Sequence, residues 1–245
     1  MSKKYRNPPI MEVVCEFRFP IETPWDITIP GLLYEKVKEK FPHREPRIIQ
    51  HMEIKQARRE VEHKFHTEER IFFFDSSKKT FIQAGHRILS INRLRPYISW
   101  NEFKPNIEKA FTSLLDIVNV KNLQRIGLRY INKIEIPKTS VDLETYFEFR
   151  PFLGSKLPQN IVDFIVGCMF AFNNGQNMCK VELKSAVPDT PEHNAFMLDL
   201  DYFLAKPQTV SADQALEWVD DAHDKVEKIF EGCITDELRK IFGEE

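Results

Sequence analysis

Two acidic side chains on one face of a predicted strand are the first groups in this sequence that could do chemistry. In the run LDLDYF, Asp199 and Asp201 share one parity, and successive strand side chains alternate between faces. A hairpin would bring Glu182 of KVELKS to the same face. Three neighbouring carboxylates can hold Mg²⁺ or act as acid and base. The same alternation is typical of a solvated outer face, and we favour that interpretation over a metal site.

One histidine lies among acidic residues near the end of the chain. His223 stands in DDAHDK, within a predicted amphipathic helix at residues 211–230. It is either a functional histidine or part of a polar helix surface, and we favour the surface. The sequence has no nucleophile elbow, Walker loop, GxGxxG or HExxH motif. We therefore predict no catalytic residue and no cofactor.

The run QRIGLRYINKIEIP (124–137) alternates over its whole length and predicts a half-buried strand. Tyr130 and Asn132 fall on its inward parity, whereas Gly127 and Arg129 fall on its outward parity. An inward Asn must find a hydrogen-bond partner, either within the chain or in a ligand. A glycine inside a strand usually marks a bulge or the close approach of another group. These positions are candidates for binding a ligand or a partner.

A basic and aromatic run, GHRILSINRLRPYISW (85–100), is the best candidate for nucleic-acid contact. Arginines bind phosphates, and aromatic rings stack on bases. An isoelectric point near 6.4 and the lack of a dense basic stripe argue against such binding. The candidate residues are Arg87, Arg93, Arg95, Tyr97 and Trp100.

The composition of the 245 residues is that of a globular chain, with 42% hydrophobic residues and 20 Phe. No apolar run is long enough for a signal peptide or a membrane span, and the four cysteines form no CxxC pair. We therefore expect a cytoplasmic protein with reduced thiols. Residues 1–120 carry 21 Lys and Arg against 16 Asp and Glu, and residues 121–245 carry 14 against 21. This asymmetry either leaves two solvated surfaces or attracts oppositely charged partners.

The order of the predicted elements repeats and suggests an internal duplication. The run EVVCEFRFP (12–20) matches the strand at 124–137 with an offset of 111 residues, and amphipathic helices at 99–118 and 211–230 close the two units. Between them we expect strands at 47–56, 61–67, 70–75, 80–94, 161–173, 177–187 and 194–204, with a break at AGH inside the run 80–94. The sequence predicts an α+β fold of two β-α-(β)3–4-α units, residues 1–120 and 121–245. The units would form one curved antiparallel sheet with long helices on one face.

Two architectures use such units, the saddle of TATA-box-binding-like proteins and the helix-grip domain. In a saddle with pseudo-twofold symmetry, Arg18 and Arg129 are equivalent and flank a shared groove. Their simpler role is in structural salt bridges, with Glu16 and Glu135 as nearby acidic residues. Neither architecture fixes a function.

Four runs together resemble a known family: NPPIMEVVCEFRF, IGLRYINKIEIP, MLDLDYF and AHDKVEKIFEGCITDELRKIF. It is the sporadically distributed family of uncharacterised bacterial and archaeal proteins of comparable length. The resemblance implies a patchy distribution, as mobile or defence-associated genes have, and it carries over no catalytic residues. The recurring motif residues here are Gly127, Leu128, Arg129, Tyr130, Asn132, His223, Phe230, Thr235, Asp236 and Arg239. Thr235 would cap a last short helix, and Arg239 would reach back to the sheet or the closing helix.

Three functional hypotheses remain after this reading. The leading one is a non-enzymatic protein of the antitoxin, immunity or defence-accessory type, which binds a protein encoded by a neighbouring gene or forms a homo-oligomer. The second is a saddle-like nucleic-acid binder that uses residues 85–100 with Arg18 and Arg129. The third is a helix-grip ligand binder or hydrolase with Tyr130 and Asn132 in a cavity.

Overall fold

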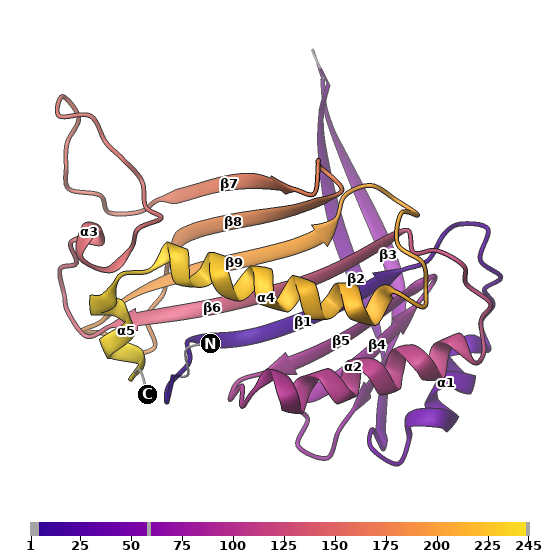
Figure 1. The fold of residues 1–245 in the computed structure, drawn as a ribbon. Helices are drawn as coiled ribbons and strands as arrows, with labels where there is room; N and C mark the ends of the chain where they lie inside the picture. Colours follow the sequence, from indigo (N-terminus) through magenta and orange to yellow (C-terminus); the bar gives the residue numbers. More distant parts are fainter. Residues whose placement is uncertain (1–4, 58–59, 244–245) are drawn as a thin grey trace.

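The computed structural model describes residues 5–57 and 60–243, with the backbone alone for residues 50–57 and 60–66. The strands are β1 (Ile10–Arg18), β2 (His43–Ala57), β3 (Glu60–Phe74), β4 (Thr80–Gly85), β5 (Ile88–Leu94), β6 (Arg125–Ile136), β7 (Ile165–Phe172), β8 (Asn177–Ala186) and β9 (Asn194–Leu204). The helices are α1 (Ile29–Val37), α2 (Trp100–Leu115), α3 (Leu143–Tyr146), α4 (Ala215–Cys233) and α5 (Asp236–Phe242). Figure 1 shows their arrangement.

All nine strands form one sheet in the order β2-β3-β4-β5-β1-β6-β9-β8-β7, and every neighbouring pair is antiparallel. The long helices α2 and α4 lie side by side on one face of this sheet, with α1 beyond α2 (Figure 1). We call this the helix face and the opposite one the open face. The predicted α+β class with an antiparallel sheet and helices on one face is confirmed.

The sheet has the same order of strands on either side of its centre. Outward from the centre, the first half runs β1, β5, β4, β3, β2, and the second half runs β6, β9, β8, β7. The two leading strands pair with each other, with Glu16 opposite Gly127. One buried cluster reaches from Val37 and Phe41 in the first half to Val226 and Leu238 in the second. Both halves therefore share one sheet and one core.

The helices form where the apolar periodicity predicts them. Ser99 caps α2 by accepting a hydrogen bond from the Glu102 amide, and the buried stripe of α2 faces the sheet. Helix α4 begins differently. The helix starts at Ala215 with no side-chain cap, because the Ser211 hydroxyl donates to the Gln214 side chain instead of accepting from a helix amide.

Strand boundaries differ from the expected ones in three places. The predicted strands 61–67 and 70–75 are one strand, β3, because β2 pairs with it along its whole length. The predicted strand 47–56 begins four residues earlier, at His43. The predicted break at AGH within residues 80–94 is confirmed, because β4 and β5 are separated by a turn where Arg87 has a φ of 56°. The predicted strand 161–173 begins at Ile165.

Candidate functional site

Asn132 finds its partner within the chain. Its side chain is 1% exposed, and Nδ2 donates to the carbonyl of Leu198 at 3.1 Å. Leu198 is the residue opposite Asn132 in the neighbouring strand β9. A buried amide with this partner needs no ligand for its nitrogen. The hydrogen bond locks the register of β6 against β9.

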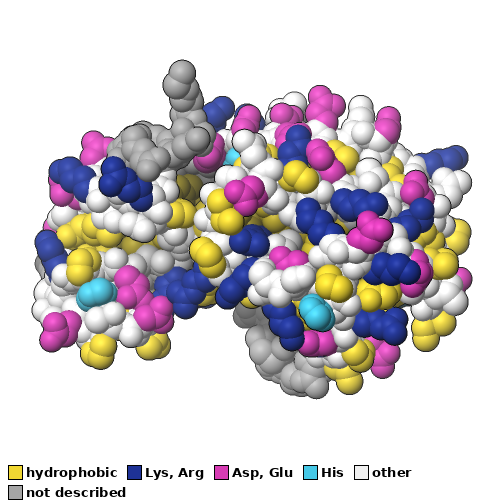
Figure 2. Space-filling view, turned by 90° about the horizontal axis from the view of Figure 1, so that it is seen from below, with side chains coloured by type: hydrophobic (Ala, Val, Ile, Leu, Met, Phe, Trp, Pro, Cys, Tyr) yellow, Lys and Arg dark blue, Asp and Glu magenta, His cyan; other side chains and the backbone are white. Residues whose placement is uncertain are grey.

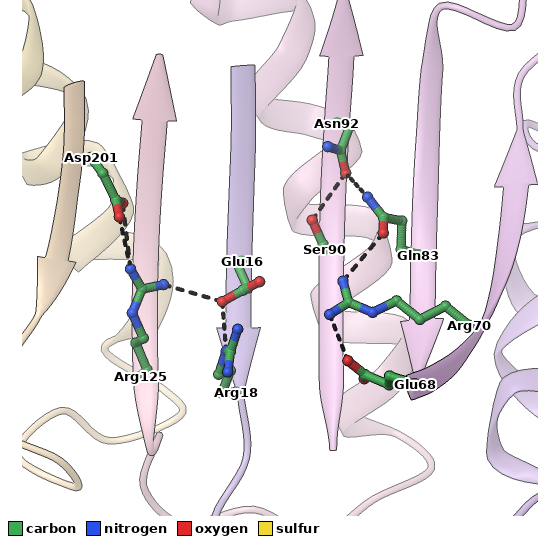
Figure 3. Close-up of polar contacts among 9 residues, drawn as sticks. All are labelled: Glu16, Arg18, Glu68, Arg70, Gln83, Ser90, Asn92, Arg125 and Asp201. Carbon is green, nitrogen blue, oxygen red and sulfur yellow. Dashed lines mark hydrogen bonds and ion pairs between the residues drawn. The ribbon is translucent and has the colours of Figure 1, made fainter. Parts of the chain in front are cut away.

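Gly127 makes room for an arginine of its own strand. A Cβ at this position would lie 2.6 Å from Nη1 of Arg125, whose side chain folds back across β6. The Arg125 guanidinium reaches Glu16 on β1 and Asp201 on β9, both at 3.1 Å. Figure 3 shows this bridge across three strands of the open face. The close approach that the glycine predicts is therefore intramolecular.

Arg18 and Arg129 both lie on the open face, and each is paired with a carboxylate. Arg18 donates to Glu16 at 2.7 Å, which is the predicted salt bridge. Arg129 pairs with Asp199 through Nε at 2.8 Å and through Nη2, and Glu135 instead pairs with Lys133 and His193. Burial raises the pKa of Asp201, and the two arginines nearest it, Arg125 and Arg129, oppose this rise.

A second polar network lies on the open face of the first half, where the sequence analysis identified no site. Arg70 is buried and donates to Glu68 at 2.8 Å and to Gln83 at 3.2 Å, while its Nε has no hydrogen-bond partner in the described part of the chain. Gln83 donates in turn to Asn92, which also accepts from Ser90 (Figure 3). The only sequence signal for this network is the outward parity of its members.

The carboxylates proposed as metal ligands do share one face, as predicted. Glu182 lies opposite Asp199 in the register of β8 and β9. Each is paired with a cation, since Glu182 lies 2.7 Å from Lys180 and 3.1 Å from Lys184. Among the described residues, no group of three or more His, Cys, Asp or Glu is placed to hold a metal ion. The arrangement is that of a charge-balanced sheet surface.

His223 lies where the two halves meet on the helix face, in a cluster with Tyr97, Trp100 and Tyr130 that we call the seam. Its Nδ1 is 2.9 Å from the Tyr130 hydroxyl, and its ring stacks on Trp100 of α2 with centroids 4.2 Å apart. Burial lowers the pKa of His223, although Glu227, Asp224 and Asp220 act in the opposite direction. The histidine thus joins α4, α2 and β6, which is a structural task.

Acid is expected to destabilise this seam. Because the folded state lowers the pKa of His223, the unfolded chain binds its proton more readily below about pH 6.5. The contribution of His223 to the free energy of unfolding is present above that pH and is lost as the pH falls below it. Urea unfolding at pH 7.5 and 5.5 should give a smaller pH difference for His223→Gln than for the wild type. An unchanged difference would contradict this role.

The nucleic-acid candidates do not come together on one surface. The aromatic pair lies in the seam, with Tyr97 edge-on to Tyr130 and Trp100 stacked on His223. Burial raises the pKa of Tyr97 to about 12. The three arginines are engaged within the chain: Arg87 with the Thr23 carbonyl, Arg93 with Thr80 and Arg95 with Asp189. Acidic and basic side chains are interspersed on the face seen in Figure 2.

Arg239 holds the C-terminal helix against α4, as the sequence suggests. Thr235 caps α5 by accepting from the Leu238 amide. Arg239 donates to the Glu231 carboxylate at 2.9 Å and to the Glu231 carbonyl at 2.6 Å. These contacts give the residue a structural role at the end of the fold.

The edge strand β7 carries a feature that the sequence analysis missed. All eight of its residues, IVGCMFAF, are uncharged, and none is buried. Ile165 is 67%, Met169 54% and Phe170 44% exposed. Strand β8 covers one side of β7, and among the described residues no strand pairs with the other side. An exposed apolar strand at a sheet edge is an interaction surface or an aggregation hazard.

Hydrogen-bond geometry defines which backbone groups of β7 are free for pairing. The Ser185 amide donates to the Phe164 carbonyl just before β7, so the even-numbered residues of β7 bond to β8. The amides and carbonyls of the odd-numbered residues therefore point away from the sheet. These residues are Ile165, Gly167, Met169 and Ala171.

The other edge of the sheet is built differently. Strand β2 presents Arg44, Glu45, Pro46 and Arg47 over its first residues. Charges and proline are the usual devices that prevent an edge from pairing with another chain. Strand β7 has neither, so the two edges of the sheet differ in what they can bind.

Comparisons with family models, with curated proteins and with solved structures returned no match. In the described part of the chain, no helix has the length and apolar character to cross a membrane.

Proposed function

We propose that this chain is a non-catalytic protein-binding protein that accepts an extended strand at the edge of β7. The carrying observation is the eight-residue uncharged edge strand with exposed side chains and outward backbone groups. Main-chain pairing at a sheet edge supplies affinity, and the flanking side chains supply specificity. The partner therefore presents an apolar β-strand.

The chemistry of this edge favours a protein over the alternatives. A phosphate backbone needs cationic side chains, and β7 has none. The buried amide of Asn132 and the guanidinium of Arg129 on the open face already have partners within the chain. This arrangement supports binding through β7 in preference to a ligand cavity beneath α4.

The biological setting of this binding rests on the family resemblance. A member of a patchily distributed, defence-associated family would act as an antitoxin, immunity or accessory subunit. Its partner would then be encoded by a neighbouring gene or be a second copy of this chain.

We further infer that residues 1–120 and 121–245 arose by duplication of one β-α-β-α unit. The matched strand order on either side of the centre supports this origin. With the offset of 111 residues, Glu16 corresponds to Gly127, and these two residues lie opposite each other at the centre of the sheet. Arg18 then corresponds to Arg129.

Substitution of the edge tests the proposed function. We expect Met169→Lys to abolish co-purification with the partner when the chain is co-expressed with the products of its neighbouring genes. The added charge would be buried against an apolar strand, which is costly. Ile27→Lys is the matched control, because Ile27 is 92% exposed and lines a pocket with residues of β2, β3 and β4, at the opposite end of the sheet from β7. Equal co-purification of both variants would contradict the proposal, as would a wild-type chain that recovers no partner and is itself a monomer.

A further inference from the structure

The sequence of β7 is complementary to itself. We propose that the strand which pairs with β7 is β7 of a second copy of this chain, antiparallel and related by a twofold axis. This inference rests on the proposed function, since it names the partner of the same edge. The pairing would join two sheets into one, with the helix faces of both copies on the same side.

Only one symmetric register uses every outward backbone group of β7. With the axis at Cys168, Ile165 pairs with Ala171 and Gly167 with Met169 of the second copy, and each pair exchanges two hydrogen bonds. If the twofold axis passed through Met169 instead, Ile165 would lie opposite Asn173 of the second copy. The positive φ of Asn173 (49°) belongs to the hairpin turn and ends the ladder. Moving the axis the other way places Ala171 opposite Asp163, which precedes the strand.

Side-chain sizes fit this register. On the open face, Met169 lies opposite Gly167 of the second copy, and Ile165 lies opposite Ala171. On this face each exposed large side chain thus meets a small one, which avoids crowding within a cross-strand pair. The strand carries no charge, so the symmetric pairing brings no like charges together.

The helix face beside β7 offers an apolar surface for the same contact. An apolar groove of about 320 Å³ lies between β7 and α4, lined by Glu148, Phe149, Phe170, Phe172, Ile229, Gly232 and Cys233. In the proposed register, Val166 of the second copy lies opposite Phe170, at this groove. Pairing would therefore cover Phe170, which is 44% exposed in the single chain. Burial of apolar area on both faces adds to the main-chain hydrogen bonds.

Cys168 lies on the proposed axis, so it lies opposite Cys168 of the second copy. A non-hydrogen-bonded antiparallel pair has Cα atoms about 4.5 Å apart, which is within the range of a disulfide. Cys168 is exposed, whereas Cys15, Cys179 and Cys233 are buried. An oxidant should therefore cross-link two copies through this thiol alone.

Sedimentation equilibrium of the purified chain tests the proposal. We expect a reversible dimer for the wild type and for Ile27→Lys, and at least about tenfold weaker association for Met169→Pro. The Met169 amide points away from β8, so proline removes a contact between copies while β8 stays paired. If Met169→Pro fails to fold, Met169→Lys serves the same purpose. A wild-type monomer, or a dimer that survives both substitutions, would overturn the proposal.

Cross-linking with diamide tests the register. Diamide takes up the two electrons and two protons released when two thiols join. We expect a disulfide-linked dimer from the wild type and none from Cys168→Ser, whereas a dimer without this cross-link contradicts the register. The failure of this inference is distinguishable from that of the proposed function. A chain that is monomeric alone but loses a co-expressed partner on Met169→Lys substitution binds another protein, not itself.

Discussion

Replacement of Phe17 by alanine is expected to lower the free energy of unfolding by about 4 kcal/mol. Phe17 is fully buried near the end of β1, a central strand of the sheet, and its ring stacks on Phe111 of α2 with centroids 4.2 Å apart. The substitution removes this stacking and leaves a cavity between the sheet and the helix. Urea denaturation followed by circular dichroism and by tryptophan fluorescence would measure the loss.

The same experiment tests whether the two halves unfold together. The core that contains Phe17 also contains Leu128 and Trp218 of the second half, so the two probes should give one coincident transition. Phe152→Ala is the control, because Phe152 is 93% exposed and its loss should change the free energy by less than about 0.5 kcal/mol. Two separate transitions in Phe17→Ala would show that residues 1–120 melt independently and would contradict the shared core.

Replacement of Arg125 by methionine is the second large effect that we expect. The change removes the guanidinium between Glu16 and Asp201, together with its contact with the Phe203 ring, but keeps most of the apolar stem. Breaking a buried ion pair costs about 3–5 kcal/mol, and the 27% exposure of Arg125 reduces this to about 2–3 kcal/mol. Urea denaturation at pH 7 would measure this loss.

The exposed arginine beside it provides the control. Arg18 bonds to the same Glu16 but is 50% exposed, so Arg18→Met should cost less than about 1 kcal/mol. The loss in the free energy of unfolding caused by Arg125→Met should also be smaller in acid. Arg125 opposes the rise that burial causes in the pKa of Asp201, so without Arg125 this pKa rises further in the folded state and protonation relieves the unpaired charge. Equal losses in the two variants would contradict the bridging role of Arg125.

Much of the fold could be predicted from alternation and helical periodicity. The parity of residues 124–137 correctly places Tyr130 and Asn132 on the buried face and Gly127 and Arg129 on the open face. The stripe of residues that faces the sheet in α4 also follows from the sequence, since Val219, Ala222 and Val226 are buried. These patterns are local, and they predict burial correctly because one face of each element must be removed from water.

The partners of the polar residues could not be predicted in the same way. The sequence indicates that Gly127 has something close to it, but the close group is Arg125, two residues earlier. The pairing of Arg129 with Asp199 depends on β9 lying next to β6, whereas β7 and β8 come earlier in the chain. These pairs depend on the position of each strand in the sheet, which the local alternation of residues does not predict.

The free edge escaped prediction for the same physical reason. The run IVGCMFAF has the composition of a fully buried strand, and a buried strand would need no explanation. Only the sheet order places it at an edge, where its apolar side chains are exposed. Tyr97 and Trp100 show the opposite case. Their basic surroundings in the sequence predict exposed rings that could stack on bases, whereas both rings pack in the seam.

Residue-resolved hydrogen exchange of β7 is the most direct test of the central claim that this edge binds another strand. Alone and dilute, the chain should protect the amides of Val166, Cys168 and Phe170, which bond to β8, and expose those of Gly167 and Met169. At high concentration, or with a co-expressed partner bound, Gly167 and Met169 should become protected as well. Fast exchange at Gly167 and Met169 under both conditions would contradict the account.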